Sequence, residues 1–532
     1  MIERLLESET VVSAFLFAYL VILLVVCVYG MHRYQLVHLY YKYRRNTPKA
    51  RACFLTLPRV TIQLPMFNEN VVARRIIDHT CRIDYPRDRL QIQVLDDSTD
   101  ETVEIARAAV EYWRGRGVDI DYVHRANREG FKAGALTHGM KTATGEFILI
   151  FDADFIPPPE IIRETIHYFT DPRVGMVQAR WEHLNREQSL LTKGQAILLD
   201  GHFVIEHAAR NRSGRFMSFN GTAGLWRRTC IEDAGGWQHD TLTEDLDLSY
   251  RAQMKGWKFQ FLPDLTSPAE LPPDMEAFKQ QQYRWAKGGA QTCRKLLPMI
   301  LRSRLPKRIK LEAFFHLTSC TVYVYVVILT LMLYPVVYLK LHVFEEGWGR
   351  YLFDASVLLL ATCGASTFYI ASQRAQFKTW SESLKYIPFL MSLGIGISLN
   401  NARAVFAGFF GKPGEFVRTP KFGVTAGDGK FQQQAQVARR KGRKIRIQPF
   451  VELAIGLYLL ACLGLCLSNH RITIGVPFIC LFMVGYLYVP LTTWFGHRLG
   501  KHILGDGTVI APGASAHSRG VQVESDPLKR SA

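Results

Sequence analysis

Long apolar runs on both sides of a polar middle constrain this chain more than any other feature. Residues 11–30 carry no charged side chain, and about 20 apolar residues in a helix cross the hydrocarbon core of a bilayer. Further apolar runs lie at about 314–340, 351–372, 386–410, 450–468 and 472–496. These runs exclude a plain soluble enzyme and predict a multi-pass membrane protein.

The charges that flank these runs predict the topology. A cleaved signal peptide needs a basic start, but the chain begins MIERLLESET, so we expect a retained helix at 11–30. Because residues 32–51 are rich in Lys and Arg, we expect the N-terminus outside and the next domain in the cytoplasm.

The run at 386–410 is the exception among the apolar runs. If it crossed the membrane, the basic segment 411–446 would lie outside, against the charge rule. Its polar residues Asn400, Asn401 and Arg403 fit an interfacial or re-entrant position better. We therefore expect five spans and a C-terminus inside, followed by a disordered tail at 501–532.

The overall composition excludes other classes of protein. The chain has 532 residues, and its 65 Lys and Arg against 47 Asp and Glu give a net charge of +18. No nucleic-acid-binding module is visible, and the densest basic run, 439–446, directly precedes an apolar run, as the positive-inside bias predicts. The ten cysteines include no CxxC pair, which argues against a disulfide scaffold or a structural zinc site.

Residues 45–300 alternate between two kinds of segment. Runs at 59–65, 90–96, 118–123 and 146–152 predict strands, and segments 69–82, 101–116, 132–143 and 158–169 predict helices. This alternation predicts an α/β domain with a mainly parallel sheet. In such sheets the ligand lies beyond the carboxyl ends of the strands.

Acidic residues stand at two of these strand ends. Asp97 closes the second strand, where Ser98 and Glu101 also have the spacing of a capping box. Asp152 and Asp154 follow the strand FILIF, and residues two apart in an extended chain face the same side. Two carboxylates aimed together suit Mg²⁺ or Mn²⁺ and, through the metal, a diphosphate.

Three other segments carry polar residues suited to chemistry. A glycine loop with Lys132 at the mouth of a helix suits a phosphate. Glu244 and Asp245 follow the small-residue stretch 219–224, and Asp245 is a candidate general base, although Thr241 and Glu244 also have capping-box spacing. The face that holds Gln281, Arg284 and Trp285, at i, i+3 and i+4, suits a phosphate and a sugar ring; an interfacial helix would look similar.

Taken together, the motifs DDS, DAD, TED and QQYRW resemble those of the membrane-bound processive family 2 glycosyltransferases, over roughly residues 55–295. The segments LPMFNEN, FNGTAGLWR and AGGW look most similar to cellulose-synthase-like mannan and glucan synthases and their bacterial relatives. Farther on, Arg418–Thr425 is similar to a gating loop with the pattern FxVT, formed here by Phe422, Val424 and Thr425.

This resemblance implies a GT-A fold, a nucleotide-sugar donor, Mg²⁺ or Mn²⁺, and inversion at the anomeric carbon. By position, Asp97 would hold the nucleotide base and Asp245 would be the catalytic base. Other residues would hold the donor diphosphate, with Asp154 the direct metal ligand: Lys132, Asp152, Gln281 and Arg284. The acceptor would contact Trp285 and Glu244.

We expect a hexosyltransferase that uses UDP-glucose or GDP-mannose to extend a β-linked polysaccharide at the inner or plasma membrane. The alternative is a non-processive enzyme that glycosylates a lipid; a non-catalytic scaffold would have lost an acidic site, and none is lost. Export coupling, an oligomer and an accessory partner stay open. The expected parts are an N-terminal membrane helix (1–44), a cytoplasmic catalytic domain (45–300), membrane and interfacial helices (301–500) with the loop 411–446, and the tail.

Overall fold

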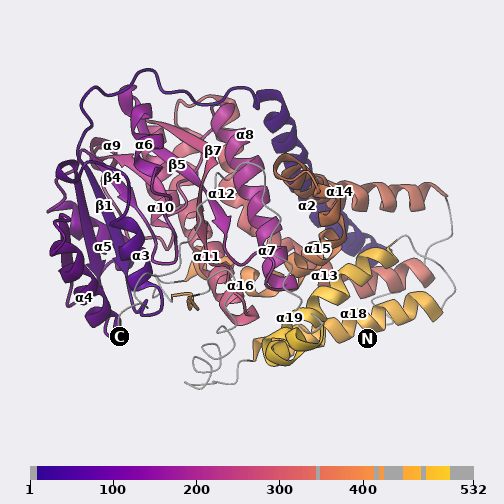
Figure 1. The fold of residues 1–532 in the computed structure, drawn as a ribbon. Helices are drawn as coiled ribbons and strands as arrows, with labels where there is room; N and C mark the ends of the chain where they lie inside the picture. The colour runs from indigo at the N-terminus through magenta and orange to yellow at the C-terminus, as the bar shows by residue number, and fades with distance from the viewer. Residues whose placement is uncertain (1–8, 343–347, 412–417, 424–446, 469–474, 504–532) are drawn as a thin grey trace.

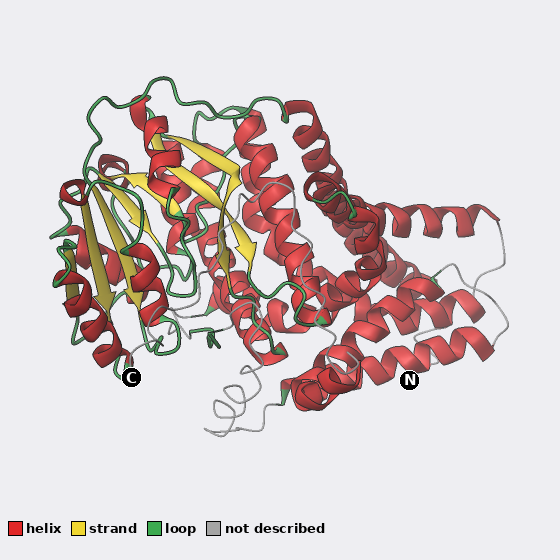
Figure 2. Cartoon of the chain, in the orientation of Figure 1, coloured by secondary structure: helices red, strands yellow, loops and turns green. Residues whose placement is uncertain are grey.

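The computed structural model describes residues 9–342, 348–411, 418–423, 447–468 and 475–503. An α/β part with one sheet lies beside a set of long helices (Figure 1), and Figure 2 separates the two by colour because all the strands are in the α/β part. The chain therefore divides into a sheet-containing part and a helical part, as the distribution of apolar runs predicts.

The sheet has seven strands in the order β3-β2-β1-β4-β6-β5-β7. Only β6 runs against its neighbours, pairing antiparallel with β4 and β5, while the other pairs are parallel. The mainly parallel sheet is therefore confirmed. The strands are β1 (Val60–Met66), β2 (Leu90–Asp96), β3 (Ile120–His124), β4 (Phe147–Ile150), β5 (Val174–His183), β6 (Gly224–Arg227) and β7 (Lys258–Ala269).

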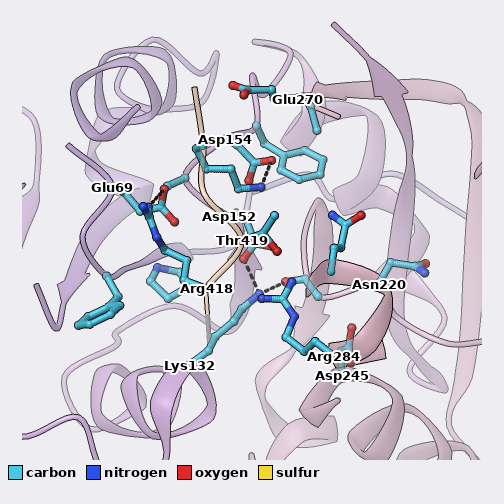
Figure 3. A pocket seen from close by; sticks show the side chains of 18 of the residues that line it. Glu69, Lys132, Asp152, Asp154, Asn220, Asp245, Glu270, Arg284, Arg418 and Thr419 are labelled. Atoms are coloured by element: carbon cyan, nitrogen blue, oxygen red, sulfur yellow. Dashed lines mark hydrogen bonds and ion pairs between the residues drawn. The ribbon is translucent and has the colours of Figure 1, made fainter. Parts of the chain in front are cut away.

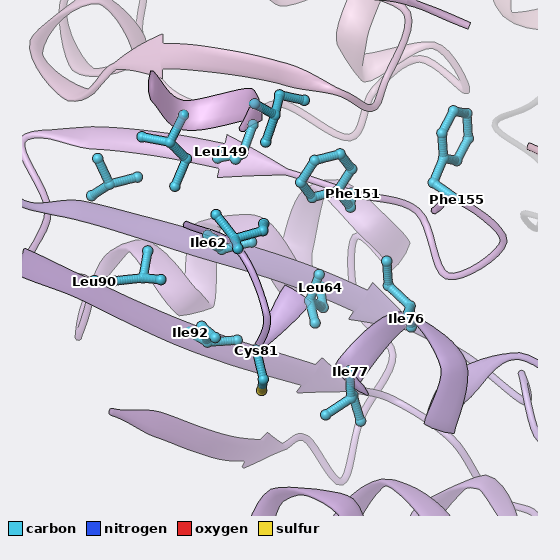
Figure 4. Close-up of a cluster of buried hydrophobic side chains, with 14 of the residues drawn as sticks. Ile62, Leu64, Ile76, Ile77, Cys81, Leu90, Ile92, Leu149, Phe151 and Phe155 are labelled. Carbon is cyan, nitrogen blue, oxygen red and sulfur yellow. The ribbon is translucent and has the colours of Figure 1, made fainter. Parts of the chain in front are cut away.

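Helices cover both faces of this sheet. The helices of the α/β part are α3 (Ala73–Thr80), α4 (Thr102–Arg114), α5 (Phe131–Met140), α6 (Ile161–Ile166), α7 (Leu190–Asp200), α8 (Ala208–Arg212), α9 (Arg228–Asp233), α10 (Glu244–Met254) and α11 (Met275–Arg302). The strands β1 and β2 are buried on both faces, as parallel strands usually are. Figure 4 shows their side chains Ile62, Leu64 and Ile92 against Ile76 and Ile77 of α3.

Ser98 and Glu101 have the spacing of a capping box but do not form one. The backbone N–H of Thr102 donates to Asp100 Oδ1 at 3.0 Å, so Asp100 satisfies the start of α4. The Ser98 hydroxyl instead accepts the backbone N–H of Asn68 at 2.7 Å. This bond ties the loop after β1 to the loop after β2, so both loops are held at the same edge of the sheet.

The helical part contains the predicted membrane runs. Its helices are α2 (Glu9–Tyr43), α12 (Lys307–Thr318), α13 (Val322–His342), α14 (Trp348–Gln376), α15 (Ile387–Gly396), α16 (Ser398–Phe410), α18 (Gln448–Ser468) and α19 (Val476–Ile503). Among the described residues, four helices are long and apolar enough to cross a membrane: Thr10–Tyr43, Lys307–Leu339, Gln448–Ser468 and Val476–Phe495. These correspond to four of the predicted spans. The predicted span at 351–372 lies within α14 and stays a prediction.

The segment 386–410 forms a bent pair of helices. The first member, with the turn that precedes α15, meets α16 at an angle of 44°. Such a pair is either one broken span or a re-entrant loop, so the described residues give four or five spans. Asn400 and Asn401 are buried, and the Asn400 amide donates to the carbonyl of Lys279 in α11 at 2.9 Å. The Asn400 amide is therefore satisfied by protein, which the predicted interfacial position did not include, whereas the buried Asn401 NH₂ has no hydrogen-bond partner among the described residues.

Helix α11 connects the two parts of the molecule. Lys279 Nζ lies 2.7 Å from both carboxylate oxygens of Glu452 in α18, and Glu452 is fully buried. A buried carboxylate needs such a partner, because losing it would leave an uncompensated charge in a medium of low dielectric. The N-terminal half of α11 is thus fixed to a membrane helix.

Candidate active site

One cavity of about 160 Å³ lies beyond the carboxyl ends of β1 and β4 (Figure 3). It collects nine predicted site residues from five separate segments. Those that line it are Asp97, Lys132, Asp152, Asp154, Glu244, Asp245, Gln281, Arg284 and Trp285. The structure therefore brings together residues that the sequence places almost two hundred positions apart.

Asp97 lies at the end of β2 and is held by a single arginine. Arg125 Nε donates to Asp97 Oδ1 at 2.7 Å, and Arg125 Nη2 pairs with the other oxygen. The preceding residue, Asp96, points elsewhere, since its Oδ2 accepts the hydroxyl of Tyr122 at 2.7 Å. Of the two adjacent acids, only Asp97 reaches the cavity.

Lys132 reaches across the cavity from the first turn of α5. The helix begins after Gly130, whose φ of 70° favours glycine at this turn. Lys132 Nζ pairs with Asp152 Oδ1 and donates to the carbonyl of Gly221 at 2.8 Å. Burial alone would lower the pKa of Lys132, but Asp152 and Glu244 raise it above its ordinary value. The ammonium group is therefore charged and ready to meet a phosphate.

Asp154 is paired with a lysine from a distant segment. Lys421 Nζ lies 2.6 Å from Asp154 Oδ2, and Arg418 Nη1 lies 2.6 Å from Glu69 Oε2. The backbone N–H of Phe422 donates to Glu270 Oε1 at 2.8 Å. The segment 418–422 is thus bound to three acids at the cavity, of which Glu69 and Glu270 are new to the site.

The predicted gating motif is only partly visible. The Phe422 side chain is buried, whereas Val424 and Thr425 lie outside the described residues. Sequence reasoning missed Glu69, Glu270 and Lys421 as site residues. Glu69 stands three residues beyond β1 in LPMFNEN, and Lys421 precedes Phe422 directly, so both lie inside segments that the resemblance already marks.

Asp152 and Asp154 fit a divalent metal that shares its coordination with a ligand. Within the described ranges, no group of three or more His, Cys, Asp or Glu side chains could hold a metal alone. Mg²⁺ commonly uses one or two carboxylates and takes its other oxygens from substrate phosphates and water. Each aspartate already accepts a lysine ammonium, so both positions favour a cation.

Glu244 and Asp245 begin α10, and the alternative of a capping box between Thr241 and Glu244 is not realised. The Thr241 hydroxyl has no hydrogen-bond partner within the described part of the chain. Burial raises the pKa of Asp245 to about 7, and the neighbouring Glu244 adds to the rise, while Lys132 opposes it. A carboxylate with a pKa near 7 is suited to accept a proton at neutral pH.

The chain approaches Asp245 closely at Gly221. A Cβ atom on Gly221, whose φ is +80°, would lie 3.2 Å from Asp245 Oδ2 and 3.3 Å from Lys132 Nζ. A larger residue would be strained in this conformation and would also crowd both groups. The small-residue stretch predicted to approach a ligand is therefore placed against the candidate base.

Helix α11 supplies the third wall of the cavity. Gln281, Arg284 and Trp285 all line it, as expected from their spacing. Burial lowers the pKa of Arg284, whereas Asp152, Glu244 and Asp245 raise it, so the guanidinium lies among the acids of the site. Figure 3 shows Arg284 beside Asp245, on the side of the cavity away from Glu69.

Comparisons with known proteins agree with this geometry. Residues 58–288 match the family described as "Glycosyltransferase like family 2". Glucomannan 4-beta-mannosyltransferase 9 of Arabidopsis thaliana is 34% identical over 415 residues, which cover 76% of this chain and 74% of that protein. Glucomannan 4-beta-mannosyltransferase 1 of Oryza sativa subsp. japonica is 45% identical over 252 residues, covering 46% of this chain and 48% of that protein.

A solved structure shares the fold. The mannosyltransferase PcManGT from Pyrobaculum calidifontis, in complex with GDP-Man and Mn²⁺, aligns with a TM-score of 0.50 and 19% identity. The alignment covers 73% of this chain and 99% of PcManGT. At this identity the likeness concerns the fold alone, and it confirms the GT-A fold that the sequence motifs imply.

Proposed function

The chain belongs to glycosyltransferase family 2, and from that premise we propose that it transfers mannose from GDP-mannose to the growing end of a β-1,4-linked mannan or glucomannan. Its relatives make it a hexosyltransferase of β-linked polysaccharide synthesis. The names of these relatives support the choice of mannose and of the linkage. One observation carries the proposal: Asp245, with a pKa of about 7, shares a single cavity with Lys132, Arg284 and the aspartate pair.

The proposed reaction is a direct displacement at the anomeric carbon. Asp245 accepts the proton of an acceptor hydroxyl as that oxygen attacks the sugar, and the nucleoside diphosphate leaves from the opposite face. The configuration at the anomeric carbon is therefore inverted. Positioning the two substrates in line makes a large contribution to the rate, and proton acceptance contributes about 10²–10⁴-fold.

The remaining residues would bind the donor and the metal. Lys132 and Arg284 would hold the leaving diphosphate, with Gln281 beside them, and Asp97 would contact the nucleotide base. Asp154, with Asp152, would hold Mg²⁺ or Mn²⁺, which when bound neutralises charge on the diphosphate. Lys421 would then have to leave Asp154, so donor binding and the position of the segment 418–422 are linked.

Trp285 would receive the acceptor, with Glu244 close by. An indole face and a sugar ring stack well, and Trp285 lies one helical turn from Gln281. We propose residues 45–300 as the catalytic domain, on the cytoplasmic side of the inner or plasma membrane, and 301–500 as the membrane part.

The test is a synthesis assay with the full chain in membranes. Radiolabelled GDP-mannose, GDP-glucose and UDP-glucose are offered separately with Mg²⁺ or Mn²⁺, and the product is sized and digested with β-mannanase or β-glucanase. Membranes that carry Asp245→Asn are the matched control. We expect long, mannanase-sensitive product from GDP-mannose in the wild type only.

Two results would overturn the proposal. Transfer of one or two sugars to a lipid would establish the glycolipid alternative. Polymer made from UDP-glucose alone would keep the synthase but replace the donor.

A further inference from the structure

A buried polar cluster connects the wall of the cavity to the N-terminal membrane helix. It centres on the π-helix η3 (Gly201–His207), which continues α7 and packs closely against α14: a Cβ on Gly201 would lie 2.5 Å from Phe368. Single π-helical turns often occur at functional sites. Here the turn places His202, Glu206 and His207 together, and none of them belongs to the site described above.

The hydrogen bonds of His202 fix its tautomer. His202 Nδ1 lies 2.9 Å from Glu206 Oε2, and the same carboxylate pairs with Arg33 and Arg210. A carboxylate only accepts, so Nδ1 must carry the proton. Burial, with Arg210 and Arg33, lowers the pKa of His202 to about 3. The ring is therefore neutral, and its Nε2 has a lone pair to offer.

This tautomer in turn sets the orientation of Asn220. Asn220 lies 3.0 Å from His202 Nε2 through its side-chain amide. Since Nε2 can only accept, Asn220 must present its NH₂ group there, and His207 Nε2 shares the same lone pair at 3.0 Å. The amide oxygen of Asn220 is then directed away from His202. That oxygen is buried and has no hydrogen-bond partner in the described part of the chain.

Asn220 stands where an acceptor sugar would lie. It lines the cavity, directly precedes Gly221, and lies on the same side as Asp245 in Figure 3. Trp181 also lines the cavity, and its buried Nε1–H lacks a partner among the described residues. Buried polar groups are rarely left unsatisfied. One acceptor and one donor without partners therefore suit a ligand that carries hydroxyl groups.

The cluster is anchored outside the catalytic domain. Arg33 belongs to α2, and Arg210 Nε also donates to Glu312 of α12 at 2.9 Å. Glu312 is fully buried and lies 3.2 Å from His32 of α2. Two helices of the membrane part thus hold Glu206 in place, and Glu206 holds His202.

We propose that Arg33, Glu206 and His202 form a positioning relay that presents the side-chain oxygen of Asn220 to a hydroxyl of the acceptor sugar. Asn220 would contact the acceptor, whereas the other three act through it. This inference rests on the proposed function and adds to it a hydrogen bond to the acceptor, set by a membrane helix. If that bond is lost, the acceptor hydroxyl is held less well, and water competes for the anomeric carbon of the donor.

The test measures how the labelled sugar is divided between polymer and free monosaccharide. Full-length wild type, Asn220→Ala, His202→Ala and His202→Gln are assayed in membranes with the donor that the wild type uses. We expect Asn220→Ala and His202→Ala to lower the ratio of polymer to free sugar by about three- to tenfold, the usual effect of one neutral hydrogen bond. The KM for the donor should stay within twofold.

His202→Gln should restore most of the ratio, because a glutamine side-chain oxygen can take the place of Nε2 as acceptor. The double variant Asn220→Ala/His202→Ala should have the same ratio of polymer to free sugar as Asn220→Ala alone, because both changes remove the same hydrogen bond to the acceptor. The control is His316→Ala, which removes a half-buried histidine that bonds Tyr250 and not Asn220. It should leave the ratio unchanged.

An unchanged ratio in Asn220→Ala, or additive losses in the double variant, overturns the inference. If His202→Ala fails to fold, Asn220→Ala and His202→Gln still decide the matter. A wild type that makes no polymer from any donor overturns the proposed function instead. The two failures are therefore distinguishable.

Discussion

The aspartates on one side of the cavity and the adjacent acids on the other differ in how they are paired. On the proposed donor side, Asp97, Asp152 and Asp154 are each paired with a cation from the chain itself, namely Arg125, Lys132 and Lys421. On the proposed acceptor side, Glu244 and Asp245 are adjacent, and burial raises the pKa of both. The three aspartates are thus ion-paired on one side, whereas the pKa values of the adjacent pair are raised on the other; near Asp154, burial also raises the pKa of Glu69 to about 7, although Glu69 pairs with Arg418.

This difference separates two kinds of chemistry. A carboxylate that already holds a cation can exchange it for a metal ion, because the charge balance of the site is kept. A carboxylate with a pKa near 7 binds a metal less readily but can take up a proton and give it back. The contrast therefore supports the proposal that metal binding lies on one side of the cavity and proton transfer on the other.

The largest effect should come from removing the proton acceptor. Asp245→Asn keeps the shape of the side chain and should lower kcat by about 10²–10⁴-fold, while the Kd for the nucleoside diphosphate stays close to that of the wild type. Radiolabel incorporation and isothermal titration measure the two quantities. The matched control is Asp119→Asn, which changes an exposed aspartate that pairs with Arg59. Near-normal turnover in Asp245→Asn would show that Asp245 is not the proton acceptor.

On the donor side, a substitution should weaken nucleotide binding, whereas Asp245→Asn should leave it unchanged. Asp154→Ala should weaken metal-dependent binding of the nucleoside diphosphate by at least about tenfold, since the loss of even an outer partner of a metal ligand commonly costs 10–100-fold. Titration with Mn²⁺ at fixed nucleotide measures this. A metal requirement identical to that of the wild type would place the metal elsewhere.

The pH dependence of the rate sharpens the contrast. Asp245 acts in its deprotonated form, and its pKa is raised to about 7, so activity is present above this pH and is lost as the pH falls through it. Below pH 7, kcat should decrease about tenfold per pH unit. A flat profile between pH 5 and pH 8 would contradict a base of this pKa.

The smallest effect is expected at Trp285. An aromatic contact of this kind contributes about 0.5–1.5 kcal/mol beyond area burial, which corresponds to roughly two- to twelvefold in binding. Trp285→Ala should therefore shorten the polymer while donor affinity is kept, as measured on a sizing gel. Trp285→Phe retains a ring, so its polymer should be intermediate in length between those of the wild type and Trp285→Ala. Full-length polymer from Trp285→Ala would contradict the role of Trp285 as an acceptor platform.

Much of the fold and site followed from local patterns. The predicted strand 90–96 coincides with β2, and Asp97, Asp152 and Asp154 were found because the ends of parallel strands meet at one edge of a sheet. Strands β5 to β7 were not predicted. Neither capping-box spacing forms a capping box, because a spacing cannot show that a hydroxyl accepts a hydrogen bond elsewhere, as the Ser98 hydroxyl does from the backbone N–H of Asn68.

What the sequence could not show are contacts between distant segments. Lys421 and Asp154 are 267 positions apart, and no periodicity or local motif relates them. No local motif relates His202 to Asn220 either. The orientation of the Asn220 amide depends on the His202 tautomer, which is set by Glu206, and Glu206 is held by Arg33. Such networks become visible only when the tertiary structure brings their members together.

Through the buried pair between Lys279 and Glu452, one helix contacts both the cavity and the helical part of the molecule. Helix α11 carries Gln281, Arg284 and Trp285 at the cavity, and its Lys279 lies within two residues of that set while bound to a membrane helix. Helix α18 is one of the helices long and apolar enough to cross a membrane, so this pair joins the wall of the cavity directly to the helical part. The sheet-containing part therefore cannot be separated from its helices without exposing a lysine and leaving the buried Glu452 carboxylate without its partner.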